Sequence, residues 1–144
     1  MYRIASVAAA LLAIPASAAA PATQFNLNCA GTLNSSSILG DKSEEYTATY
    51  RIDLAQKKWC EQDCKALHDI VSIQPAQLTL SEERVDSPSE RSFLINMIDR
   101  ETGAHKIISS SENYRIRGSI LNLRWEGTCE PATFTGFPDL KTKF

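Results

Sequence analysis

The chain has 144 residues, with 15 lysines and arginines against 17 aspartates and glutamates, which gives a formal net charge of −2. General nucleic-acid-binding proteins show a basic excess, so this balance predicts that the chain has no nucleic-acid partner. After residue 18, no apolar run approaches the roughly 20 residues that a membrane-spanning helix needs. We therefore expect no membrane span in the mature protein.

The first 18 residues have the pattern of a signal peptide. Arg3 precedes the apolar run 4–15, and Ala16-Ser17-Ala18 places small residues where signal peptidase cuts. Cleavage there leaves one β domain over residues 19–144, of ordinary single-domain size. We expect this domain to be periplasmic or secreted.

All four cysteines follow the predicted cleavage site, and an even number of cysteines in an exported chain predicts a disulfide framework. Four cysteines allow three connectivities. Cys29 and Cys129 lie on the apolar faces of the first and last predicted strands, so we expect them to pair. Cys60 and Cys64 would then form a second bridge that shapes a corner. A four-cysteine zinc site is the less favoured alternative, because the spacing is one close pair and two distant single residues.

Alternation of apolar and polar residues predicts the first strands. Residues 24–30 alternate strictly, and residues 46–54 place aromatic and β-branched side chains on a pleated pattern. The segment between them, 31–45, is rich in Gly, Ser, Asn and charge and is predicted to be a surface loop. A turn at 55–58 leads to a return strand with Trp59. A single helical turn is expected over the cysteine-closed corner, 60–66.

The second half of the chain predicts more short strands. Residues 68–73 and 77–80 are strand candidates, and the charged segment 81–90 is predicted to be a loop. Residues 91–99 and 104–109 should form a hairpin whose turn contains Gly103, since glycine tolerates the positive φ of such a turn. Further on, the expected elements are a turn at 110–113, a strand at 114–117, a last strand through Cys129 and an aromatic tail in which Phe134 and Phe137 plug an open edge or barrel mouth.

Taken together, these elements predict an all-β fold, a small antiparallel β-barrel or sandwich of about seven to eight strands with two disulfides. The pattern of residues resembles a group of small exported proteobacterial proteins for which the resemblance implies no activity. The residues that carry it are Cys29 and Gly31, Asp53 and Leu54, Trp59 and Cys60, Cys64, Arg100, Thr102 and Gly103, Gly127 and Cys129, and the tail Phe134, Gly136, Phe137 and Pro138.

The chain also resembles, more weakly, small exported barrel inhibitors of lysozyme, which have cysteines near both ends. Those inhibitors carry a Ser-Gly-containing loop before a tyrosine. Here the residues before Tyr114 read SSSEN, without the glycine.

No catalytic motif is found in the sequence, so we expect no enzyme activity and no cofactor. The pair His68-Asp69 is adjacent on a predicted strand, where neighbouring side chains point to opposite faces, and His105 is expected to be a solvated surface residue. The spacing of Cys60 and Cys64 is one residue longer than that of thiol oxidoreductases. Carboxylates such as Glu82 and Glu83 are interpreted as solvated loop residues.

Four arginines are predicted on outward strand faces, where they would form either an anion-binding patch or, as we prefer, cross-strand pairs with Asp53 or Glu126. They are Arg51, Arg115, Arg117 and Arg124. We name Trp59, Arg115 and Arg117 as candidate binding residues. Trp59 would either pack on the Cys60–Cys64 bridge or be exposed as a binding hot spot.

The predicted function is therefore a non-enzymatic module that binds another envelope or secreted protein. A lysozyme-type inhibitor and a lipocalin-like carrier of a small apolar ligand are the alternatives. A hydrolase on an unusual scaffold is the least favoured, since no nucleophile and base are seen together.

Overall fold

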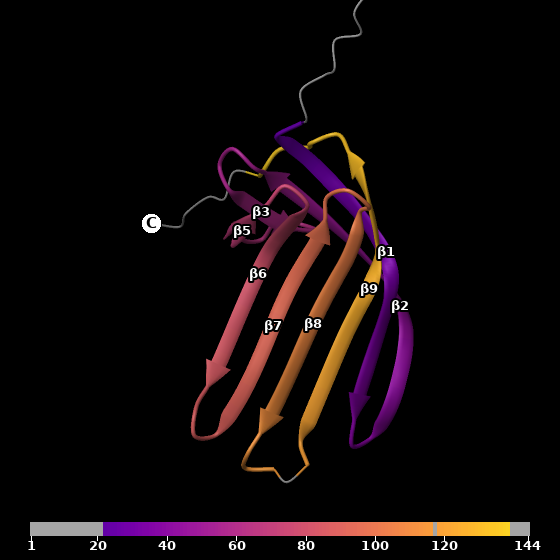
Figure 1. The fold of residues 1–144 in the computed structure, drawn as a ribbon, viewed down its shortest axis with the longest axis vertical. Helices are drawn as coiled ribbons and strands as arrows, with labels where there is room; N and C mark the ends of the chain where they lie inside the picture. Colours follow the sequence, from indigo (N-terminus) through magenta and orange to yellow (C-terminus); the bar gives the residue numbers. More distant parts are fainter. Residues whose placement is uncertain (1–21, 117, 139–144) are drawn as a thin grey trace, which may run out of the picture.

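A computed structural model describes residues 22–116 and 118–138, so the predicted signal peptide, residues 1–18, lies outside the described part. The described residues form one antiparallel sheet and no helix (Figure 1). The strands are β1 (Gln24–Ser37), β2 (Gly40–Asp53), β3 (Lys58–Glu61), β4 (His68–Asp69), β5 (Ser72–Ile73), β6 (Gln77–Asp86), β7 (Glu90–Asp99), β8 (Ala104–Asn113) and β9 (Ile120–Ala132).

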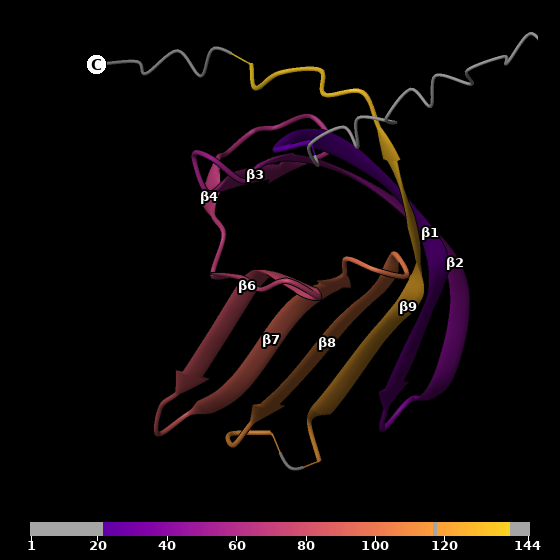
Figure 2. The same ribbon diagram turned by 45° about the horizontal axis from the view of Figure 1, so that its top comes forward.

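The sheet curls until its two edge strands meet at one end. Its order is β4-β3-β2-β1-β9-β8-β7-β6-β5, so β4 and β5, which are separated by two residues in the chain, lie at opposite edges. Ile70 donates its N–H to the Lys57 carbonyl at 2.9 Å, and Val71 donates to the Thr79 carbonyl at 3.0 Å. These two bonds join the edges. At the other end β2 and β6 extend beyond their short partners, which leaves a half-barrel (Figure 2).

The hydrophobic core lies on the concave face at the closed end, where side chains from both halves of the sheet meet. Tyr50, Ile52 and Leu80 are completely buried there. Each belongs to an alternating segment, so the period of two placed the apolar residues on one face. The rest of this core consists of Leu27, Cys29, Ala48, Trp59, Ile70, Leu78, Ile98 and Cys129.

The ladder between β1 and β9 joins residues that are about 100 positions apart in the chain. Cys29 is opposite Cys129, and two positions further along the ladder Gly31 is opposite Gly127. The two backbones approach so closely at the glycines that a Cβ atom on Gly31 would lie 2.2 Å from the Glu126 carbonyl oxygen. Only glycine fits at both positions of this pair.

Both predicted disulfides are present, Cys29–Cys129 and Cys60–Cys64, and together they use all four cysteines. The all-β, barrel-like fold is also confirmed, with nine strands in the described residues instead of seven or eight. Disulfides are typical of proteins outside the cytoplasm, so the framework is compatible with export. Within the described residues, no helix has the length and apolar character to cross a bilayer.

The predictions of surface loops at 31–45 and 81–90 were wrong. The first segment completes the β1–β2 hairpin, whose turn is confined to Ile38 and Leu39, and most of the second lies in β6. Their polar composition reflects the open end of the half-barrel, where the side chains of both faces contact water. Pairing of backbone groups with a neighbouring strand outweighed the low strand propensity of Ser, Asn and charged residues.

Four smaller predictions were also wrong. The turn expected at 110–113 belongs to β8, and residues 114–116 of the expected strand 114–117 lie in the following turn, while Arg117 is outside the described residues. The corner after Cys60 contains turns and no helical turn. The C-terminal tail crosses the convex face, because Asn26 bonds to Thr135 and Arg51 donates to the Gly136 carbonyl. Phe134 and Phe137 pack on each other there and do not fill the barrel mouth.

We predict that Gly127→Ala destabilises the protein by about 2 kcal/mol, because the added methyl group would overlap the backbone of β1. Urea unfolding followed by tryptophan fluorescence measures this change. The neighbouring Thr128 has an exposed side chain, so Thr128→Ala should change stability by less than about 0.5 kcal/mol. Equal effects of the two substitutions would contradict the close approach of β1 and β9.

The two disulfides should differ in their contribution to stability. Cys29–Cys129 closes a loop with a sequence separation of 100, and Cys60–Cys64 one of 4. In the chain-entropy model, the first contributes about 4.7 kcal/mol and the second about 2 kcal/mol. Unfolding of the double variants C29A/C129A and C60A/C64A by urea should therefore rank the first as much less stable, and the reverse ranking would argue against this account.

Candidate functional site

One concavity of the described residues is a groove on the concave face, between the closed end and the open end of the half-barrel. It has a volume of about 500 Å³ and is open to solvent along one side. Strands from both halves of the sheet line it. Figure 2 shows the curl of the sheet that brings these strands to face each other. A volume of this size is within the range of ligand-binding sites.

The floor and walls of the groove are apolar and aromatic. Leu80, Leu94 and Ile107 lie at its base. Tyr46 and Trp125 stand on one side, with their rings in edge contact at 6.5 Å between centroids. The side chains of these residues all point to the concave side of the sheet. Where the sheet no longer closes, no facing layer covers them, so they line a groove instead of filling a core.

Several acidic residues are among those that line the groove beside this apolar floor. We use the name acidic rim for four lining residues, which are Glu61, Asp69, Glu82 and Glu83. Asp69 forms an ion pair with Lys58 at 2.7 Å, and Glu82 pairs with Arg84 at 3.0 Å. Glu61 and Glu83 form no ion pair with the described residues, and no lysine or arginine is among the described residues that line the groove. The groove therefore has an uncompensated negative charge.

Glu61 lies directly opposite Tyr50 in the β2–β3 ladder, so its carboxylate is close to the floor. Burial raises the pKa of Glu61, and the nearby His68 partly opposes that shift. Burial, with the negative charge of Glu61 as a second cause, also raises the pKa of Tyr46 to about 12 and that of Tyr50 well above its usual range. Both hydroxyl groups therefore keep their protons at physiological pH.

A polar layer lies beneath the groove and is organised by His105, which is only 2% exposed. The Tyr46 hydroxyl lies 2.5 Å from His105 Nδ1, and His105 Nε2 lies 3.0 Å from the Asn96 Oδ1. Asn96 Nδ2 in turn donates to the Tyr50 hydroxyl at 3.4 Å. A neutral imidazole with its proton on Nε2 satisfies all these contacts. The prediction that His105 is a solvated surface residue was therefore wrong.

The Cys29–Cys129 disulfide lies next to this histidine. The two sulfur atoms and a ring nitrogen of His105 are within 4.8 Å of one another, and all three residues are buried. Because the sulfurs are bonded to each other, they are not thiolate ligands in this structure.

The disulfide and the glycine pair lie side by side along β1 and β9. Tyr46 of β2 is paired with Gly31, and His105 of β8 is paired with Gly127. Because the two glycines lie between them and have no side chains, the rings of Tyr46 and His105 can meet.

The candidate binding residues from the sequence lie in different places. Trp59 is 7% exposed, packs on Tyr50 and His68, and donates its indole N–H to the Asp69 carbonyl. Trp59 is therefore a buried residue that contributes to the lining of the groove, and it is not an exposed binding hot spot. Arg115 is exposed in the β8–β9 turn, far along the strands from the groove, and Arg117 lies outside the described residues.

The predicted arginine pairs are formed only in part. Arg124 contacts Glu126, but this residue is two positions away on the same strand, and Lys106 provides the cross-strand partner. Arg51 donates to the tail, as described above, while the Asp53 carboxylate accepts bonds from Gln24 and from the Gln56 N–H. An anion-binding patch of four arginines is therefore not assembled by the described residues.

Sequence reasoning missed the acidic rim because Glu82 and Glu83 were interpreted as solvated loop residues, and Asp69 was considered only as a neighbour of His68 on a strand. One sequence signal indicated an acidic residue on the inward face. Trp59 and Glu61 are two residues apart on one strand, so their side chains point to the same face of the sheet. The buried His105 had a comparable signal, since Ile107 shares its parity. His68 and Asp69 both line the groove. The His68 ring packs on Trp59, and the Asp69 carboxylate forms an ion pair with Lys58.

We predict that His105 makes stability depend on pH. Burial lowers the pKa of His105 from 6.5 to about 4 in the folded state. Between these values the unfolded chain binds more protons, so stability falls as pH falls from about 6.5 to 4, by about 3 kcal/mol in total. The variant His105→Gln should remove this part of the slope in urea unfolding measured at several pH values. An unchanged slope in the variant would refute the assignment.

Comparison of the chain with protein-family models, curated proteins and solved structures gives no match. The functional argument therefore depends on the chemistry of the groove, and the resemblance noted from the sequence stays a prediction.

Proposed function

We propose that this protein is a non-enzymatic binding module, periplasmic or secreted, whose groove takes a basic segment of another exported protein. The observation that carries the proposal is the acidic rim around an aromatic and apolar floor, without a lysine or arginine among the described lining residues. Net negative potential in a concave site attracts cationic partners and steers their approach.

Lysine and arginine side chains match both parts of this groove. Their aliphatic stems pack on apolar and aromatic surface while their charged ends reach carboxylates. Tyr46, Trp59 and Trp125 provide aromatic surface, and Glu61 and Glu83 provide carboxylates that form no ion pair with described residues. A cation over an aromatic face gains further from the ring quadrupole.

A free strand edge borders the groove and offers a way to hold such a segment. β5 pairs only with Leu78 and Thr79 of β6, so residues 80–86 of β6 have no strand on their outer side among the described residues. An extended peptide can add to an exposed edge through main-chain hydrogen bonds, with alternate side chains facing inward. A partner strand beside β6 would place every second side chain over the acidic rim.

A lysozyme-type inhibitor is a specific form of this function, in which the basic segment belongs to the target enzyme. The second candidate, a lipocalin-like carrier, is supported by the apolar floor and the groove volume of about 500 Å³. The acidic rim favours the first candidate, since a carrier of a purely apolar ligand would gain nothing from four carboxylates at its entrance.

The binding test uses a synthetic peptide of alternating lysine and valine, with an alternating glutamate and valine peptide for comparison. We expect calorimetry to detect binding of the basic peptide only, and to find it weakened by salt. The variant E61Q/E83Q removes two carboxylates without ion pairs, so the affinity should fall about tenfold.

The matched control is E101Q/E130Q, which changes the net charge equally at two exposed residues that do not line the groove. Its affinity should change by less than about twofold, as expected for distant surface charges that salt screens. If the control loses as much affinity as the groove variant, or if both peptides bind equally, the groove is not the binding site. Co-purification of a small apolar molecule seen by native mass spectrometry would favour the carrier.

A further inference from the structure

Three hairpin turns lie side by side at the open end of the half-barrel. They are the β1–β2 turn at residues 38–39, the β6–β7 turn at 87–89 and the β8–β9 turn at 114–119, and both ribbon views show them at the same end (Figures 1 and 2). Tyr114 donates its N–H to the Ser89 carbonyl at 3.0 Å. A Cβ atom on Gly118 would lie 3.5 Å from the Ile38 side chain. The turns therefore form one continuous surface.

Large apolar side chains are concentrated on this surface. Leu39 is 91% exposed, Ile38 69% and Ile116 59%. Of the nine exposed large apolar residues in the described part, seven are at this end, the others there being Val85, Tyr114, Ile120 and Leu121. Single exposed apolar residues need no explanation, but a group on adjoining turns marks an interaction site. We call the residues Ile38, Leu39, Tyr114, Arg115 and Ile116 the tip surface.

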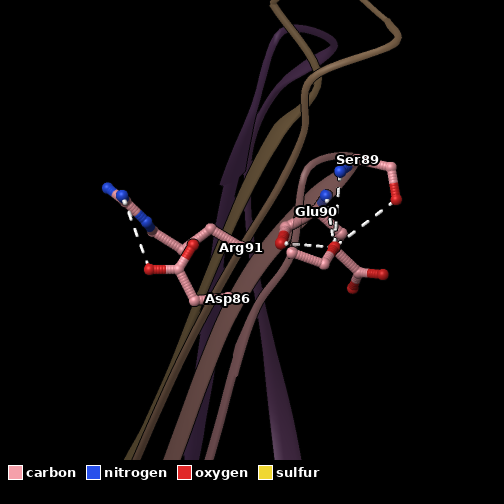
Figure 3. Close-up of polar contacts among 5 residues, drawn as sticks. Asp86, Ser89, Glu90 and Arg91 are labelled. Atoms are coloured by element: carbon pink, nitrogen blue, oxygen red, sulfur yellow. Dashed lines mark hydrogen bonds and ion pairs between the residues drawn. The ribbon is translucent and has the colours of Figure 1, made fainter.

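The charged residues inside the three turns are basic, and the exposed Asp86 and Glu90 flank the β6–β7 turn directly. In residues 38–39, 87–89 and 114–119 the charged residues are Arg115 and Arg117, of which Arg115 is exposed in the structure and alternates with Tyr114 and Ile116. Carboxylates such as Asp86 begin in the adjoining strands. Figure 3 shows that Asp86 faces Arg91, with 3.8 Å between the carboxylate and the guanidinium group.

The backbone of these turns is hydrogen-bonded within the turns. In the β6–β7 turn the Ser87 hydroxyl accepts the N–H of Glu90 at 3.0 Å and that of Ser89 at 3.4 Å. In the β8–β9 turn, Ile116 donates to the Asn113 carbonyl and Ser119 to the Ile116 carbonyl. Polar groups that already have partners lower the cost of moving a turn into a less polar environment.

We infer that the tip surface docks on an anionic lipid bilayer. Ile38, Leu39 and Ile116 would enter the boundary between headgroups and acyl chains, and Arg115 would contact lipid phosphates. A tyrosine at this depth is typical of membrane interfaces, and peripheral binding strengthens with buried apolar area together with electrostatic attraction to anionic lipids. A bilayer also accepts separate projecting side chains without a matching pocket for each, which a protein partner would require. The groove lies further along the strands, so docking leaves it open to its ligand.

The test is flotation of the protein with vesicles of phosphatidylcholine, with and without phosphatidylglycerol. We expect binding to the anionic vesicles that is about fivefold stronger than to the neutral ones, the contribution of one arginine near a charged surface. Arg115→Gln should remove that preference. L39S/I116S should weaken binding to both kinds of vesicle by more than about tenfold, because two apolar side chains are lost from the lipid.

The matched control is L67S, which removes an exposed apolar side chain at the closed end. Its binding should stay within about twofold of the original protein, since Leu67 is outside the tip surface. Circular dichroism checks that each variant is folded. The inference is overturned if the protein does not float with anionic vesicles, if the control loses as much binding as L39S/I116S, or if L39S/I116S instead converts a dimer of this chain into a monomer.

Discussion

The close pairing of β1 with β9 is the constraint on which the rest of the structure depends. This ladder joins the first and the last strand, and it places Cys29 opposite Cys129 and Gly31 opposite Gly127. The disulfide fixes the ladder covalently. The glycines then leave room above it for the rings of Tyr46 and His105, which meet from the strands on either side. The Gly31–Gly127 pair thus allows the close approach of β1 and β9 and also the contact between Tyr46 and His105 under the groove.

The half-barrel separates a structural end from an exposed end. At the closed end the two sheet edges are joined through Ile70 and Val71, and the buried side chains form the core. Toward the open end the same strands continue without a facing layer, so their inward side chains line the groove and their turns carry exposed apolar residues. Strand length beyond the core therefore provides the surface on which both proposed interactions depend.

Much of the framework could be predicted from the sequence, because period-two alternation and cysteine parity are local signals. Residues 24–30 and 46–54 alternate clearly, and the position of Cys29 and Cys129 on apolar faces predicted their bridge. The polar ends of β1, β2 and β6 carry no such alternation, so they were predicted to be loops although pairing makes them strands. The acidic rim and the contact between Tyr46 and His105 depend on strand order, with β1 next to β9, which a single sequence does not encode locally.

The β1–β9 ladder also has a consequence for how the chain acquires its structure. The strands before residue 70 and those after it can each form by pairing with near neighbours in the chain, since β1 pairs with β2 and β6 to β9 pair in order. The two halves can be united only when the last strand is available to bond to the first. Contacts between such distant residues form slowly, because loop closure precedes any gain from pairing. Final folding must therefore await the last strand, and only then can the Cys29–Cys129 bridge lock the finished ladder.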